Sequence, residues 1–177
     1  MRYGISHPSL TPGVIEARAY QLEAADEALS GSTMLVLPTA AGKTVVAWMV
    51  FADRLESSDG WVLVVAPTVA LVEQHLRGIE PVLADAASVN PISITGQNPV
   101  AKRADLWGSS RLVVATPQVV RNDVIRGVLD LSGCALLVVD EAHHSTGDHA
   151  MAQVGDLYLS QASEPVSYTH LTLPTKA

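Results

Sequence analysis

Five short apolar runs alternate with helix-like segments along this chain, and no other sequence feature constrains the fold as strongly. The runs are rich in β-branched residues and occupy residues 33–37, 61–66, 92–95, 111–116 and 135–140. Four of them are apolar almost throughout, as is typical of strands covered on both faces. Strands that alternate with helices predict an α/β fold, in which a mostly parallel sheet carries helices on both faces.

The segments between these runs have recognisable helix boundaries. Thr68 is a candidate N-cap, and the dipeptides Asn98-Pro99 and Thr116-Pro117 each offer an N-cap followed by proline at the first helical position. A chain of 177 residues is long enough for one domain with a sizeable core and short for two. We expect helices over residues 17–29, 44–55, 69–83, 100–107 and 119–125.

Composition narrows the class of protein. With 48% apolar and 16% charged residues, the chain is typical of a globular domain. The apolar stretch TVVAWMVFA is too short to span a bilayer, and the first ten residues lack the apolar core of a signal peptide, so no membrane partner is expected. A single cysteine, Cys134, fits a reducing, cytoplasmic compartment, and its apolar neighbours predict a buried, inert thiol. The net charge of −7 argues against a generally basic nucleic-acid binder but allows local phosphate contacts through backbone amides.

The segment LPTAAGKT, residues 37–44, follows an apolar run and opens a predicted helix, which is the context of a phosphate-binding loop. Backbone N–H groups at such a helix N-terminus point at phosphate oxygens. Gly42 would let the backbone pass close to phosphate, Lys43 would reach the β- and γ-phosphates, and Thr44 would ligate Mg²⁺. The strict pattern has glycine where this chain has Leu37, so an ordinary strand–helix turn is the alternative interpretation of this segment alone.

The segment LLVVDEAHH, residues 136–144, places two carboxylates at the end of an apolar run, where ligands of open α/β sheets bind. Asp140 is suited to hold Mg²⁺ through water, and Glu141 to orient and deprotonate an attacking water. An isolated acidic pair after a strand is usually a solvated turn. The phosphate loop upstream, with strands between the two motifs, favours a catalytic role instead.

Together, DEAH at 140–143 and PTAAGKT at 38–44 resemble the first RecA-like motor domain of superfamily 2 helicases and translocases. In that superfamily the loop commonly lacks the first glycine, so Leu37 fits the family pattern, and Ala40 is a familiar variant. The resemblance implies a RecA-like P-loop domain that uses ATP and Mg²⁺, with Lys43, Asp140 and Glu141 as catalytic residues and Thr44 and Asp140 as the Mg²⁺ ligands. The implied ATP-binding residues are Arg18, Gln21, Pro38, Thr39, Ala40, Ala41, Gly42, Lys43 and Thr44.

Other short stretches resemble further motifs of the family, in the family's order. RAYQ resembles the adenine-reading Q motif, because the amide of Gln21 can donate and accept at once; taken alone, Gln21 would be an exposed helix glutamine. APTVALVEQH, TGQ and ATPQVVRND resemble motifs Ia, Ib and Ic, which grip one nucleic-acid strand by its phosphates. Thr68 and Thr116 suit such phosphate contacts, because each offers a hydroxyl and backbone N–H groups at a predicted helix N-terminus. The alternative role, which does not exclude the first, is that of a plain N-cap. The implied nucleic-acid contacts are Pro67, Thr68, Gln74, Thr95, Gly96, Thr116, Pro117 and Gln118.

His143 would, by the same resemblance, couple the ATP site to the nucleic-acid site and to a second motor domain. A zinc site is the alternative for the group His143, His144, Asp148 and His149. No cysteine lies nearby and the spacing matches no standard zinc site, which argues against it.

A finer resemblance is to the archaeal Hef-like and FANCM-type branch of the superfamily. Its members tend to begin with HP, PG and EARxYQ, and this chain has the same order in residues 7–21. The resemblance implies a helicase or translocase acting on branched or forked DNA, with DNA favoured over RNA. The alternatives are an RNA helicase of the duplex-RNA-sensing group and a P-loop ATPase unrelated to nucleic acid.

The last residues differ in amino-acid composition from the rest of the chain. VSYTHLTLPT, residues 166–175, can be back-translated into a common transposase-type sequencing adapter, whereas its composition also permits a β-rich strand. We therefore expect residues 1–164 to form the helicase ATP-binding domain and residues 165–177 to be an adapter-derived, non-native tail. The family's next motif and its second RecA-like domain are not in this chain, so the resemblance implies a missing second domain in cis.

Overall fold

The computed structural model describes residues 2–4, 7–13, 16–18, 32–37, 43–140, 148–162 and 165–168. Within this part, six parallel strands form one sheet in the order β5-β6-β4-β7-β3-β8. This arrangement confirms the predicted parallel α/β fold. The strands are β3 (Ser32–Leu37), β4 (Trp61–Val65), β5 (Ile92–Ile94), β6 (Leu112–Ala115), β7 (Cys134–Asp140) and β8 (Pro165–Tyr168).

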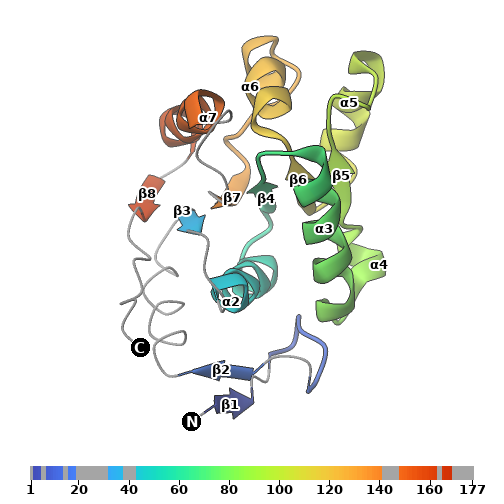
Figure 1. Cartoon of the computed structure of the whole chain (residues 1–177), viewed down its shortest axis with the longest axis vertical. Coiled ribbons are helices and arrows are strands. Elements are labelled where there is room, and N and C mark those ends of the chain that lie inside the picture. Colours follow the sequence, from blue (N-terminus) through green and yellow to red (C-terminus); the bar gives the residue numbers. More distant parts are fainter. Residues whose placement is uncertain are drawn as a thin grey trace.

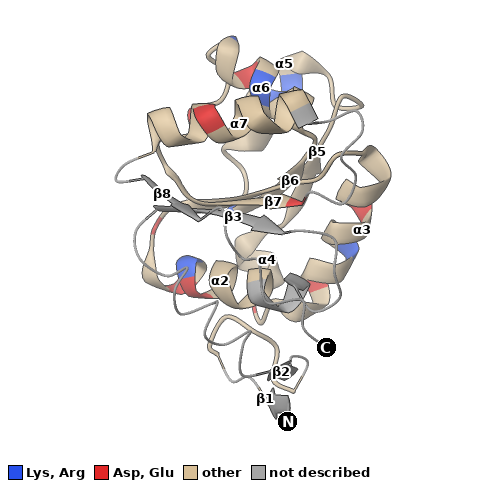
Figure 2. Cartoon of the chain, turned by 60° about the vertical axis from the view of Figure 1, so that its left-hand side comes forward, with Lys and Arg blue, Asp and Glu red and all other residues tan. Residues whose placement is uncertain are grey.

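Helices cover both faces of this sheet (Figures 1 and 2). One face carries α2 (Lys43–Ser57), α3 (Val69–Ile79), the short 3₁₀ helix η1 (Glu80–Val82) and α4 (Ala86–Val89). The other carries α5 (Val100–Trp107), α6 (Pro117–Ile125) and α7 (Asp148–Gln161). A separate antiparallel pair, β1 (Arg2–Gly4) and β2 (Glu16–Arg18), lies beyond α2 and away from the main sheet.

The sheet separates two apolar cores, because successive side chains of a strand point to opposite faces. On β4, Val62 and Val64 belong to the core under α2 and α3, whereas Leu63 and Val65 belong to the core under α5, α6 and α7. All four side chains are at most 4% exposed. The continuous apolar runs of the sequence thus reflect strands buried on both faces, as expected.

The expected elements differ from the observed ones in several places, and strand β1 and the short helix α4 were not expected. The helix expected over 17–29 is wrong at its start, because residues 16–18 form a strand that pairs with residues 2–4; its remainder, residues 19–29, lies outside the described residues. The helix expected over 69–83 ends at Ile79, because Pro81 has no N–H to continue the ladder and the chain tightens into η1. Helix α6 begins at Pro117 instead of the expected Val119, and α7 was not expected at all.

The capping expectations have mixed outcomes. Thr68 is confirmed as an N-cap, since its hydroxyl accepts from the Leu71 N–H at 3.2 Å. Thr116 occupies the N-cap position of α6 without a side-chain capping bond, and Pro117 follows it at the first turn. Asn98 is not the N-cap of α5: Pro99 holds that position, and the Asn98 side chain accepts instead from the Thr95 N–H at 2.9 Å. The Asn98 side chain, which was expected to cap α5, therefore forms its hydrogen bond within the preceding turn.

Residues 7–13 run along the end of α3 and η1. Leu10 is 3% exposed and belongs to the core under α2 and α3. The Thr11 N–H donates to the Val82 carbonyl at 2.7 Å, and the Ala84 N–H donates to the Ser9 carbonyl at 3.0 Å. Gly13 has a φ of +77°, a left-handed conformation that glycine adopts without steric cost. The HP and PG pairs therefore flank a segment that packs the chain's beginning onto this core.

Candidate nucleotide and nucleic-acid site

The carboxyl ends of the parallel strands meet along one edge of the sheet. Register pairs Leu37 with Asp140, so the last residue before the predicted phosphate loop lies beside the predicted Mg²⁺ carboxylate. Further along the edge, Val65 pairs with both Val139 and Ala115, and Ala115 pairs with Ile94. The residues that follow these pairs carry the expected site. Open α/β sheets bind their ligands at this edge.

The order of the strands divides the edge into two halves. The end of β3 and Asp140 on β7 occupy one half, which carries the predicted nucleotide motifs. Thr68, Thr116 and Thr95 follow β4, β6 and β5 in the other half, which carries the predicted nucleic-acid motifs. The predicted nucleotide motifs and the predicted nucleic-acid motifs therefore lie on different halves of one sheet edge.

Asp140 is the most informative described residue of the nucleotide half. It is the last residue of β7, and its side chain is 13% exposed. His75 on α3 places Nε2 at 2.5 Å from Asp140 Oδ2. Asp140 is therefore a carboxylate held by a specific partner, which argues against the alternative of a solvated turn.

The remaining predicted nucleotide residues are placed only by their backbone or lie outside the described part. Lys43 and Thr44 are the first two residues of α2, at a helix N-terminus as predicted, and nothing is described of their side chains. Arg18 is the last residue of β2. The residues outside the described part are Gln21, Pro38, Thr39, Ala40, Ala41, Gly42, Glu141 and His143.

The predicted nucleic-acid residues differ in exposure. Thr95 and Thr116 are 3% and 6% exposed, so both residues are buried, and the Thr95 hydroxyl accepts from the Gln97 N–H at 3.3 Å. Pro117 is also buried, while Pro67 and Gln118 are half-buried. Of the predicted nucleic-acid residues, Thr68, Gln74 and Gly96 are exposed to solvent.

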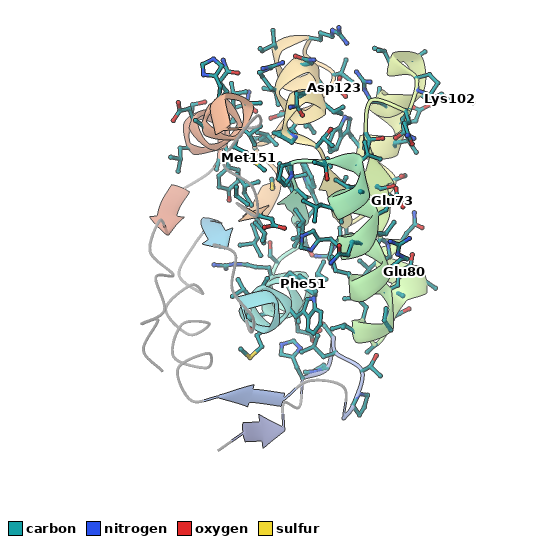
Figure 3. The ribbon with its side chains drawn as sticks, in the orientation of Figure 1. Phe51, Glu73, Glu80, Lys102, Asp123 and Met151 are labelled. Atoms are coloured by element: carbon teal, nitrogen blue, oxygen red, sulfur yellow. The ribbon has the colours of Figure 1, made fainter. Side chains whose placement is uncertain are left out.

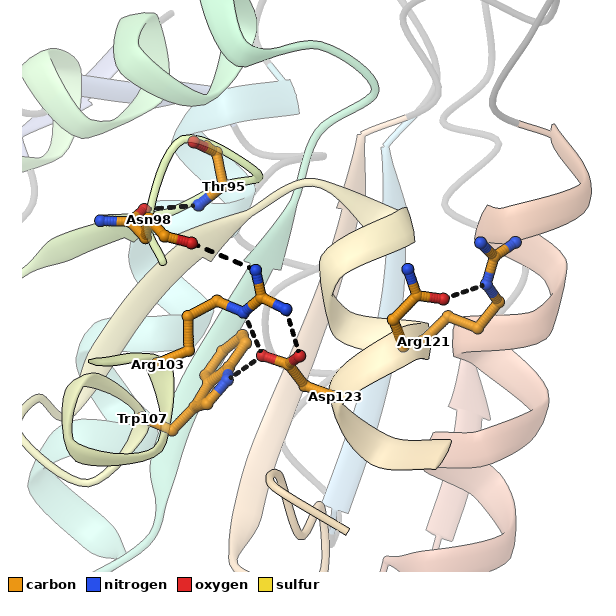
Figure 4. Close-up of polar contacts among 7 residues, drawn as sticks. Thr95, Asn98, Arg103, Trp107, Arg121 and Asp123 are labelled. Atoms are coloured by element: carbon orange, nitrogen blue, oxygen red, sulfur yellow. Dashed lines mark hydrogen bonds and ion pairs between the residues drawn. The ribbon is translucent and has the colours of Figure 1, made fainter. Parts of the chain in front are cut away.

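A buried polar network supports the turn that carries Thr95 (Figure 4). Arg103 on α5 donates from Nε and Nη2 to the two carboxylate oxygens of Asp123 on α6, at 2.8 and 2.7 Å. Trp107 donates from Nε1 to the same carboxylate at 2.8 Å, and Arg103 Nη1 donates to the Asn98 carbonyl at 3.2 Å. Asn98 closes the turn by accepting from the Thr95 N–H. The network therefore connects α6, α5 and the turn after β5.

Sequence reasoning missed His75, Arg103 and Asp123. His75 lies between Val72 and Ile79 on the buried face of α3, and Figure 3 shows α2, with Phe51, beside this helix. A polar side chain on an otherwise apolar helix face is a signal that it needs a partner. The bidentate partner of Arg103 lies 20 residues away, and no local pattern identifies it.

The Asp140 carboxylate fits Mg²⁺, because it supplies the hard oxygen donors that this cation prefers. No cluster of three or more His, Cys, Asp or Glu side chains occurs among the residues that the structure describes. Within the same part of the chain, every helix is too short or too polar to cross a membrane.

A parallel α/β sheet with a carboxylate at one strand end, beside the strand that leads into the predicted phosphate loop, is typical of a RecA-like P-loop domain. The chain belongs to the DEAD/DEAH box helicase family, whose family model matches residues 18–170. A protein of Methanocaldococcus jannaschii, provisionally named as the ATP-dependent RNA helicase MJ1505, is 44% identical over 150 residues, which are 85% of this chain and 19% of that protein. The DEAD-box ATP-dependent DNA helicase Fancm of Drosophila melanogaster is 35% identical over 160 residues, 88% of this chain and 11% of that protein.

The crystal structure of the Pyrococcus furiosus Hef helicase domain superposes with a TM-score of 0.73 at 33% identity. The match covers 85% of this chain and 32% of that structure. The chain thus spans a fifth or less of the two relatives' lengths and about a third of the solved helicase domain. These matches confirm the expected family and its Hef-like and FANCM-type branch.

Proposed function

We propose that this chain is the ATP-binding motor domain of an ATP-dependent nucleic-acid helicase or translocase that acts on branched or forked DNA. The observation that carries the proposal is the shared sheet edge, on which Asp140 lies in register with Leu37 while Thr68 and Gly96 are presented beyond β4 and β5. The Drosophila relative is named as a DNA helicase, which supports DNA as the substrate class.

The positions of Lys43, Thr44 and Asp140 support the proposed roles of the nucleotide residues. Lys43, at the first turn of α2, would bind phosphate oxygens, and Thr44 and Asp140 would hold Mg²⁺. When bound, Mg²⁺ neutralises the charge of the β- and γ-phosphates. Glu141 would accept a proton from the attacking water. An arginine that stabilises the γ-phosphate in the transition state would come from a second RecA-like domain, so the chain by itself should bind ATP and hydrolyse it slowly.

The test of the nucleotide site is a binding measurement. Isothermal calorimetry on the 177-residue chain should show Mg²⁺-ATP binding, and Lys43→Ala should weaken it about tenfold or more, because a hydrogen bond to a charged group contributes about 1.5–3 kcal/mol. Lys102→Ala removes an exposed lysine on α5 and is the matched control, expected to bind as the unaltered chain does. Equal affinity of the Lys43→Ala and Lys102→Ala variants would refute the assigned role of Lys43.

The test of the substrate class compares three labelled nucleic acids in fluorescence anisotropy at one fixed salt concentration, because phosphate contacts are salt-dependent. Forked DNA should bind more tightly than linear duplex DNA or duplex RNA. Tighter binding of duplex RNA would favour the RNA helicase alternative, which the name given to the M. jannaschii relative also suggests. Binding of none of the three would leave the unrelated P-loop ATPase as the better reading.

A further inference from the structure

We propose that His75 is a positioning residue that fixes the Asp140 carboxylate for Mg²⁺, an inference that rests on the proposed function. His75 Nε2 lies 2.5 Å from Asp140 Oδ2. Because an ionised carboxylate can only accept, the imidazole must donate from Nε2. One oxygen of the carboxylate is thereby held at a defined place, which sets the direction in which the group as a whole faces.

The surroundings of the His75–Asp140 hydrogen bond strengthen it. The His75 and Asp140 side chains are 19% and 13% exposed, so little water competes for either. They line a small cavity whose other walls include Trp48, Phe51 and Ile79. In such apolar surroundings a hydrogen bond is electrostatically stronger than in water.

The position of the imidazole is fixed by helix packing. Val72 and Ile79 lie three residues before and four residues after His75, on the same helix face, and are 0% and 3% exposed. Thr68 caps the beginning of the same helix. A side chain on a packed helix holds its partner more precisely than one on a loop, so the carboxylate is oriented before any ligand arrives.

Hydrogen-bond partners of metal-ligating groups typically change metal affinity by about tenfold to a hundredfold when they are removed. The test therefore measures how much Mg²⁺ strengthens ATP binding to the 177-residue chain, by calorimetry with Mg²⁺ and with EDTA. In glutamine, Nε2 is separated from Cα by the same number of bonds as Nε2 of histidine, so His75→Gln keeps the donor. His75→Asn is one bond shorter and loses it. Ile79→Val trims the same cavity wall without changing a hydrogen bond and is the packing control.

The gain in affinity from Mg²⁺ should fall about tenfold in His75→Asn, while the affinity in EDTA stays unchanged. His75→Gln and Ile79→Val should keep the full gain. A full gain in His75→Asn, or an equal loss in His75→Gln and His75→Asn, would overturn the positioning role. If the unaltered chain binds no ATP, the proposed function itself fails; if it binds ATP with no gain from Mg²⁺, the metal site and this inference fail together.

Discussion

At the residue scale, Cys134 illustrates how burial determines chemistry. It begins β7 with 1% of its surface exposed, and its thiol donates to the Leu136 carbonyl at 3.2 Å. Burial raises the pKa of the Cys134 thiol to about 12, because the thiolate would lose its hydration. The burial of this thiol, expected from its apolar neighbours, is confirmed, and its inertness stays a prediction.

This raised pKa predicts a loss of stability at high pH. The unfolded thiol titrates near the ordinary value of 9.0 and the folded thiol near 12, so the stability that the neutral thiol contributes is complete below 9 and declines as the pH rises toward 12. At pH 10 the unfolding free energy of the unaltered chain should have fallen by about 1.4 kcal/mol relative to that of Cys134→Ala, compared with their difference at neutral pH. Urea unfolding of both chains at the two pH values measures this, and a difference that does not change with pH would contradict it.

At the element scale, the sequence predicts what depends on local pattern. The runs that became β4 and β7 were placed to within one residue, because strands buried on both faces are apolar throughout. Helix α7 was missed although Ala150, Val154 and Tyr158 recur every four residues on its buried side. The pairing of β1 with β2 and the contact of His75 with Asp140 could not be predicted, because both join distant segments whose proximity depends on the complete fold.

The buried pair between α5 and α6 gives the prediction at this scale. The Arg103 and Asp123 side chains are 6% and 0% exposed. Arg103→Leu should lower the unfolding free energy by about 3–5 kcal/mol, because it leaves the Asp123 carboxylate buried without its cation. Urea denaturation followed by circular dichroism measures the change.

Arg121→Ala is the matched control for that prediction, since Arg121 is a half-buried arginine on α6 that donates to Gln153 at 3.1 Å. It should cost about 1–3 kcal/mol, because it removes this hydrogen bond and a second one, from Arg121 Nε to Asn122 Oδ1 at 3.1 Å, and each usually contributes about 0.5–1.5 kcal/mol. The double variant Arg103→Met with Asp123→Leu should recover most of the loss, because an apolar pair leaves no uncompensated charge. Equal costs for Arg103→Leu and Arg121→Ala would show that burial of the pair has no special energetic role.

At the scale of the whole molecule, the edge strand β8 is the element whose origin most needs a test. It pairs Pro165–Tyr168 with Ser32–Leu35 of β3, and it begins the segment that we propose to be adapter-derived. A β-rich composition favours a strand in either case.

Deletion of residues 166–177 should change the unfolding free energy by less than about 0.5 kcal/mol, because a segment that was not selected to pack on this core contributes little. Thermal unfolding of the chain with and without the segment measures this. Leu131→Ala is the positive control: the Leu131 side chain is 0% exposed, and its truncation should cost about 2–5 kcal/mol. A loss of several kcal/mol on removal of the tail would make it native structure.

The buried pair of Arg103 and Asp123 also restricts how this sequence can diverge. A descendant that loses the arginine first keeps a carboxylate in the interior, and one that loses the aspartate first keeps a guanidinium there. Either single loss should lower the unfolding free energy, so we expect selection to disfavour it. We therefore expect these two positions, 20 residues apart in the chain, to change together, whereas the exposed neighbour Lys102 should tolerate substitution.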